Sequence, residues 1–128
     1  MRYLAPEEIL VVHARIVDAT GCVHGARDIG RILSASERPK LRFDGNDLYS
    51  TVFDKAAAYF ESVAFDHPFV DGNKRTALAV AARFLHLNGY ELTATNQALE
   101  RFAITAVRNK YAKDTVSSWF RKHARKMR

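Results

Sequence analysis

The sequence predicts an all-α fold, and three observations support this. Apolar residues recur every three or four positions in several segments, which is the spacing of one helix face. Residues 75–88 are apolar around almost the whole helix circumference, as in a central, buried helix. No series of strands with alternating apolar and polar residues appears. Because the chain has 128 residues and no linker, repeat or low-complexity tract, we expect a single domain over residues 1–128.

The first helix is expected to begin at Pro6, since proline followed by acidic residues is typical of a first helical turn, and to end near Thr20–Gly21. Residues 22–47 contain several glycines and a proline. They predict a long irregular connection with a short helix around Asp28–Ser34. A connection of this length is long enough to have a function of its own.

A second long helix is expected to be capped by Asn46 or Asp47 and to run to about Phe65 with one apolar face. The buried helix over residues 75–88 comes next. Gly89 is placed to end it, because glycine readily adopts the left-handed conformation that follows a helix.

Two more helices are expected in the last third of the chain. After a short extended piece at Tyr90–Leu92, Thr95 or Asn96 is expected to cap the first of them, and Asp114 the second. Trp119 is expected to pack the last helix onto the core.

Composition favours an ordinary soluble globular protein, with 48% hydrophobic and 27% charged residues. No apolar run approaches the length of a membrane span, and the N-terminus lacks the apolar stretch of a signal peptide. We therefore expect a cytoplasmic protein that does not interact with a membrane. The lone Cys22 agrees with a reducing compartment.

The net charge of +6 comes from the end of the chain, where residues 108–128 hold eight basic residues and one acidic residue. A basic last helix complements the negative end of its own dipole and is usually a solvated face. Nucleic acid is therefore not directly expected as a partner. A nucleic-acid-binding or ribosome-binding module that uses Arg121–Arg128 stays open as an alternative.

The segment His67–Thr76 has the most informative composition in the chain. Gly72, Asn73 and Lys74 stand where the buried helix begins, and the free N–H groups and positive dipole of a helix start attract anions. Asn73 can cap that helix or donate its amide to a phosphate. Lys74 and Arg75 add two cations, so the segment indicates a phosphate site.

The same segment supplies groups for chemistry on that phosphate. The Asp71 carboxylate suits Mg²⁺, which takes few protein ligands beside waters and substrate phosphates. His67 is a candidate general base. Together they indicate phosphoryl or nucleotidyl transfer from a Mg²⁺-nucleotide to a hydroxyl. Phe69 is interpreted as an apolar anchor for the loop. The alternative is a purely structural turn with a helix cap and solvated cations.

With these residues in view, the segment resembles the loop and helix motif of the Fic/death-on-curing family, H-P-F-x-(D/E)-G-N-(G/K)-R, at every fixed position. The resemblance implies a compact helical domain in which a central buried helix follows the motif loop. It implies His67 as the catalytic base and Asp71 as the metal ligand. Gly72, Asn73, Lys74 and Arg75 would bind the nucleotide, with Mg²⁺ as cofactor and ATP or another NTP as co-substrate.

Two positions differ from the adenylylating members of the family, which have glycine in place of Lys74 and a second arginine in place of Leu78. The death-on-curing toxins have lysine at the first position, and in them the nucleotide is thought to present its γ-phosphate. The resemblance therefore implies a protein kinase that modifies a threonine of a translation factor, elongation factor Tu, and halts translation. A Fic-type adenylyltransferase is the runner-up. A catalytically dead regulator has no support from the complete motif.

The family resemblance also implies a partner. Many Fic proteins contain an inhibitory helix of the form (S/T)-x-x-x-E-(G/N), and this sequence has none. We therefore expect a cognate small antitoxin of the prevents-host-death type, which would restrain the toxin in trans. No P-loop or protein-kinase signature supplies a purine pocket, and we expect one along Leu41–Tyr49.

Overall fold

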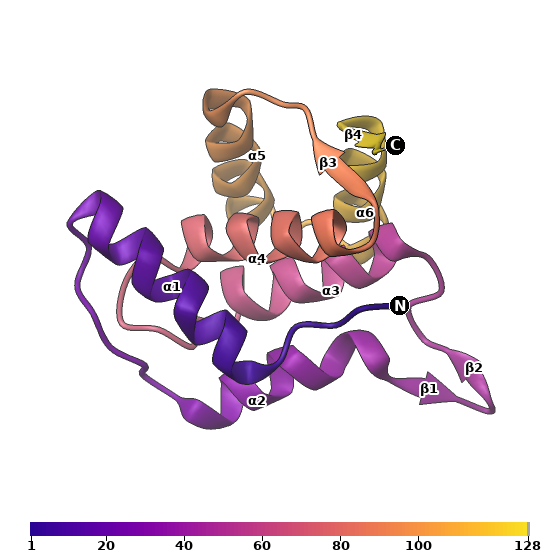
Figure 1. Ribbon diagram of the computed structural model, residues 1–128, viewed down its shortest axis with the longest axis horizontal. Coiled ribbons are helices and arrows are strands. Elements are labelled where there is room, and N and C mark those ends of the chain that lie inside the picture. Colours follow the sequence, from indigo (N-terminus) through magenta and orange to yellow (C-terminus); the bar gives the residue numbers. More distant parts are fainter. Residues whose placement is uncertain (128) are drawn as a thin grey trace.

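The computed structural model describes residues 1–127 and consists of helices with four short strands (Figure 1). The elements are α1 (Pro6–Thr20), α2 (Ile29–Glu37), the 3-10 turn η1 (Arg38–Lys40), β1 (Arg42–Phe43), β2 (Asn46–Asp47), α3 (Val52–Ala64), α4 (Asn73–Leu87), β3 (Tyr90–Leu92), α5 (Asn96–Arg108), α6 (Lys113–Lys122) and β4 (Ala124–Lys126). The strands form two small antiparallel pairs, β1 with β2 and β3 with β4. The all-α prediction is thus confirmed.

The helices form three layers with α3 and α4 in the middle (Figure 1). α1 and α2 pack on one side of this pair, and α5 and α6 pack on the other. Most of the core comes from the middle layer, where Tyr59, Phe60, Phe84 and Leu85 have no exposed surface. Between α3 and α4 runs the loop of residues 65–72, which contains most of the motif.

Several expected boundaries are confirmed. α1 has the predicted bounds, and Gly89 follows the end of α4 with φ +90°. Thr95 caps α5 by accepting a hydrogen bond from the backbone N–H of Ala98. Trp119 stacks on Phe102 with ring centroids 4.1 Å apart, so it does pack the last helix onto the core.

Two predicted caps are wrong. Neither Asn46 nor Asp47 caps a helix, because both belong to β2, where they pair with β1. The cap of α3 is Thr51, whose hydroxyl accepts a hydrogen bond from the N–H of Asp54. Asp114 lies inside the first turn of α6, where its charge still favours the helix start although it does not cap it.

Burial also differs from the expected pattern in the first half of the chain. α3 was expected to have one apolar face, but every residue from Phe53 to Ala64 except Asp54 is buried. α3 can be buried on all sides because the two outer layers and α4 surround it. α2 extends beyond the predicted Ser34 to Glu37, and its apolar residues Ile32 and Ala35 pack into the core.

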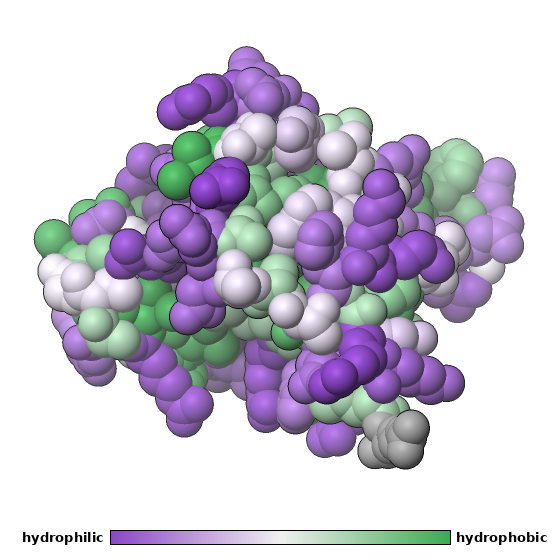
Figure 2. Space-filling view, turned by 90° about the horizontal axis from the view of Figure 1, so that it is seen from above, coloured by the Kyte–Doolittle hydropathy of each residue, from purple (hydrophilic) through white to green (hydrophobic). Residues whose placement is uncertain are grey.

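Hydrophilic residues cover most of the face that α5 and its neighbours present (Figure 2). Apolar residues are visible between them, chiefly toward the end of the molecule where α4 begins (Figures 1 and 2). Among residues 1–127, no helix combines the length and the hydrophobicity needed to cross a bilayer.

Tyr59→Phe tests the contact between the N-terminal segment and the middle layer. The buried Tyr59 hydroxyl accepts a hydrogen bond of 2.9 Å from the N–H of Leu4, and burial raises the pKa of Tyr59 to about 12. Removing the hydroxyl leaves that N–H unpaired, so we expect unfolding in urea to show a loss of about 1–2 kcal/mol. Tyr111→Phe is the control, because its hydroxyl has no hydrogen-bond partner among residues 1–127. Equal stability of the two variants would contradict the prediction.

Candidate functional site

The loop between α3 and α4 is anchored by Phe69, as the sequence predicted. Phe69 is 1% exposed and stacks on the His13 ring of α1, with centroids 3.7 Å apart and planes 4° from parallel. His13 has a structural role, because its Nε2 is 2.9 Å from the backbone oxygen of Asp71. Sequence reasoning missed that this histidine positions the motif loop. In the sequence, only the position of His13 on the apolar face of α1 indicated that its side chain contacts the core.

Asn73 closes the loop from the other side. Its side-chain oxygen accepts a hydrogen bond from the Phe69 N–H at 3.1 Å, and its amide donates to the Phe69 carbonyl at 3.0 Å. Asn73 was expected either to cap the helix or to donate its amide to a phosphate. It does not cap the helix, because Gly72 is the N-cap residue and Asn73 begins α4. Gly72 has φ +76°, a conformation that favours glycine. Asn73 therefore holds the loop while Gly72 makes the turn into the helix.

The segment before α2 clamps the same loop through backbone hydrogen bonds. The N–H groups of Arg27 and Asp28 both donate to the Pro68 carbonyl, and the Val70 N–H donates to the Gly25 carbonyl. An isolated β-bridge between Ala26 and Phe69 lies between these bonds. The long connection after α1 thus gives the motif loop an extended, supported backbone.

His67 lies two residues before this anchor, in the left-handed region at φ +50°. Its imidazole is partly exposed and has no hydrogen-bond partner among residues 1–127. The ring borders a cleft of about 540 Å³ that also includes the start of α4 and one face of α5. A free imidazole at a cleft wall is available to accept a proton from a bound molecule.

The Asp71 carboxylate lies at the same cleft and is exposed. It accepts hydrogen bonds from the backbone N–H groups of Val23 at 3.2 Å and Gly72 at 2.9 Å. These bonds hold the pKa of Asp71 below its ordinary value, so the carboxylate is charged at neutral pH. No group of three or more potential metal ligands occurs among residues 1–127. A single charged carboxylate fits Mg²⁺, which completes its coordination with water and substrate oxygens, better than it fits a structural metal.

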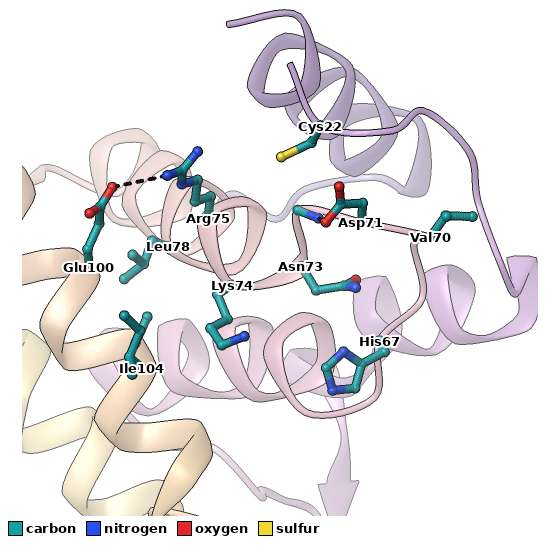
Figure 3. A pocket seen from close by; sticks show the side chains of 12 residues that line it. Cys22, His67, Val70, Asp71, Asn73, Lys74, Arg75, Leu78, Glu100 and Ile104 are labelled. Atoms are coloured by element: carbon teal, nitrogen blue, oxygen red, sulfur yellow. Dashed lines mark hydrogen bonds and ion pairs between the residues drawn. The ribbon is translucent and has the colours of Figure 1, made fainter. Parts of the chain in front are cut away.

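Two cations lie beside these groups at the start of α4. Lys74 is exposed and has no acidic partner among the described residues, whereas Arg75 lies 3.7 Å from the Glu100 carboxylate of α5. Figure 3 shows Lys74 between His67 and Ile104, and Arg75 turned toward Glu100. The structure thus brings all six predicted site residues, His67, Asp71, Gly72, Asn73, Lys74 and Arg75, to one cleft.

The opposite end of the cleft is mainly apolar, with Glu100 at its edge (Figure 3). Leu78 of α4 and Ala103 and Ile104 of α5 form its wall, and Ile104 is 45% exposed (Figure 3). Sequence reasoning missed the α5 residues, since nothing in their spacing shows that this helix faces the motif. The purine pocket that the sequence predicted along residues 41–49 finds no support, because none of these residues lines the cleft.

Residues 41–49 do not line the cleft because they lie at the other end of α3. The β1–β2 hairpin contacts the first turn of α3, where the Asp47 carboxylate lies 3.3 Å from the Lys55 amine. The motif loop follows the last turn of α3, and the 13 residues between give about 20 Å of helix. The hairpin and the motif loop, which borders the cleft, are therefore at opposite ends of the middle layer (Figure 1).

Comparisons with known proteins agree with the motif. The family model described as Fic/DOC matches residues 3–85. The chain is 44% identical over 92 residues to "Toxin Doc" of Mycolicibacterium smegmatis, a match that covers 72% of this chain and 68% of that protein. It is 34% identical over 92 residues to "Protein kinase doc" of Escherichia phage P1, covering 72% of each chain.

Asn73→Ala tests whether the two side-chain bonds to Phe69 hold the motif loop. Loss of both bonds leaves partly buried backbone groups unpaired, so we expect about 1–2 kcal/mol lower stability. Hydrogen exchange should accelerate most at residues 66–72. Asn109→Ala is the matched control, since the Asn109 side chain is exposed and makes no hydrogen bond within the described residues. Unchanged exchange in the loop would show that Asn73 is not what holds it.

Proposed function

Because the chain belongs to the Fic/DOC family, we propose that it is the toxin of a toxin–antitoxin pair and acts as a protein kinase. It transfers the γ-phosphate of a Mg²⁺-nucleotide to a hydroxyl of a protein. The observation that carries this proposal is the single cleft in which a free imidazole, a charged carboxylate, two cations and a helix start meet. Two relatives support the two halves of the proposal by their names, a toxin and a protein kinase.

The proposed reaction uses His67 as general base. Its imidazole takes the proton of the acceptor hydroxyl, whose oxygen forms a bond to the γ-phosphorus. The bond between that phosphorus and the bridging oxygen of the β-phosphate breaks, and the nucleoside diphosphate leaves. Mg²⁺ held by Asp71 would neutralise phosphate charge. Lys74, Arg75 and the N–H groups at the start of α4 stabilise the negative charge on the transferred group.

The orientation of the nucleotide follows from the two ends of the cleft. The phosphates belong at the polar end, beside Gly72 and Lys74, and the nucleoside belongs against the apolar wall of Leu78 and Ile104. Lys74 and Leu78 replace the glycine and arginine of adenylylating relatives. This pair supports transfer of the γ-phosphate rather than of the nucleotidyl group.

The finer parts of the proposal rest on the family resemblance. They are a threonine of elongation factor Tu as acceptor, arrest of translation, ATP as the first nucleotide to test, a small antitoxin as partner, and one domain over residues 1–128 in the cytoplasm. A nucleic-acid-binding role for Arg121–Arg128 has less support. Arg121 packs over the Phe53 ring and Arg125 pairs with Glu91, while Arg128 lies outside the described residues.

Labelled ATP tests the reaction and its base. With the wild type, label from the γ position should enter the acceptor protein, and label from the α position should not. His67→Ala should lower transfer at least about a hundred-fold while nucleotide binding is retained, because only proton abstraction is lost. His86→Ala is the control, since His86 is exposed at the far end of α4 and outside the cleft. Incorporation of α-label alone would establish adenylylation instead.

Ile104→Asp tests the nucleoside end of the cleft. An aspartate removes the apolar contact with the nucleoside, so we expect nucleotide affinity, measured by calorimetry, to fall about ten-fold. Leu10→Asp is a matched control, because Leu10 is a similarly exposed helix residue (38%) on α1 and does not line the cleft. Equal affinity in the two variants would place the nucleoside elsewhere.

A further inference from the structure

A second cleft, of about 460 Å³, lies on the other side of His67. Its walls come from the start of α2 and from the beginning of the motif loop. The residues that line it are Asp28, Gly30, Arg31, Ser34, Phe65, Asp66 and His67. His67 is the only residue that this cleft shares with the cleft at the start of α4. The imidazole therefore stands between two separate spaces.

Hydrogen bonds and an ion pair hold the walls of the second cleft together. The Arg31 guanidinium donates a hydrogen bond to the Asp66 carbonyl, and its Nε lies 3.4 Å from the Asp28 carboxylate. Asp28 also caps α2 by accepting from the Arg31 N–H. These contacts tie the wall formed by α2 to the residue directly before His67.

These contacts also determine the net charge of the second cleft. The positive charge of Arg31 is compensated by Asp28. The Asp66 carboxylate is exposed and has no cationic or hydrogen-bonding partner among residues 1–127. It is thus the uncompensated charge of the second cleft, whereas the first cleft has the cations Lys74 and Arg75. Negative charge on one side of His67 and positive charge on the other separate two kinds of ligand.

We propose that the second cleft binds the hydroxyl-bearing segment of the protein substrate, and that Asp66 selects a lysine or arginine next to the acceptor hydroxyl. This inference rests on the proposed phosphotransfer. A general base must contact the hydroxyl while the phosphate approaches that oxygen from another side. A triphosphate is repelled by Asp66 and attracted by Lys74, so the acceptor is the ligand whose charge fits the second cleft.

The proposal assigns Asp66 to binding and not to chemistry. Its replacement should change the KM for the acceptor protein and leave the affinity for nucleotide unchanged. An exposed ion pair is screened by salt, so the preference should weaken as ionic strength rises. A role in holding the fold would instead change stability and both affinities together.

The test begins with γ-labelled ATP and a bacterial extract, from which the labelled protein is purified and its modified residue mapped. Asp66→Lys, placed at the C-terminal end of α3 where a cation suits the helix dipole, should fold normally. It should raise the KM for the purified acceptor about three- to five-fold. Asp44→Lys is the matched control, since it makes the same charge change at an exposed residue of the β1–β2 hairpin that has no ion-pair partner among residues 1–127.

A charge exchange completes the experiment. Changing the lysine or arginine beside the mapped hydroxyl to glutamate should raise the acceptor KM of the wild type and lower that of Asp66→Lys. Absence of a basic neighbour, or an unaltered KM in Asp66→Lys, would overturn the acceptor cleft and leave phosphotransfer standing. Absence of γ-label in the wild-type reaction would overturn the proposed function and this inference with it.

Discussion

The contact between Phe69 and the core is the constraint on which the candidate site depends. Its ring stacks on His13 of α1, and its backbone is held by the Asn73 side chain of α4. With Phe69 held in the core, His67 and Asp71, two positions before and after it in the loop, lie at the cleft. An apolar contact, without chemistry of its own, sets the positions of the polar groups.

The site is also organised by charge. The helix start, Lys74 and Arg75 make one side of His67 favourable for phosphate, and the uncompensated Asp66 makes the other side unfavourable for it. The Glu100 carboxylate near Arg75 moderates the positive side. Because these groups come from the loop after α3, from α4 and from α5, their arrangement exists only in the folded chain. The motif in the sequence shows which chemical groups are present but not how they are arranged.

Local signals in the sequence predicted local structure well. Pro6 and Gly89 mark real helix ends, and Thr95 caps as expected, because these effects act within one turn. Asn46 has a stronger intrinsic preference for a helix cap than Thr51, yet it pairs with β1 and forms part of a strand instead. The apolar wall on α5 could not be predicted, since Ile104 faces the motif only through packing of distant segments. The motif itself identified the six cleft residues, whose roles remain predictions.

The left-handed backbone of His67 has a consequence for selection. A residue with a Cβ at φ +50° is less stable there by about 1 kcal/mol than glycine would be. The most relaxed residue for this position is therefore one that has no imidazole. A glycine here would remove the proposed base and stabilise the folded protein, so selection for stability and selection for activity act in opposite directions at residue 67.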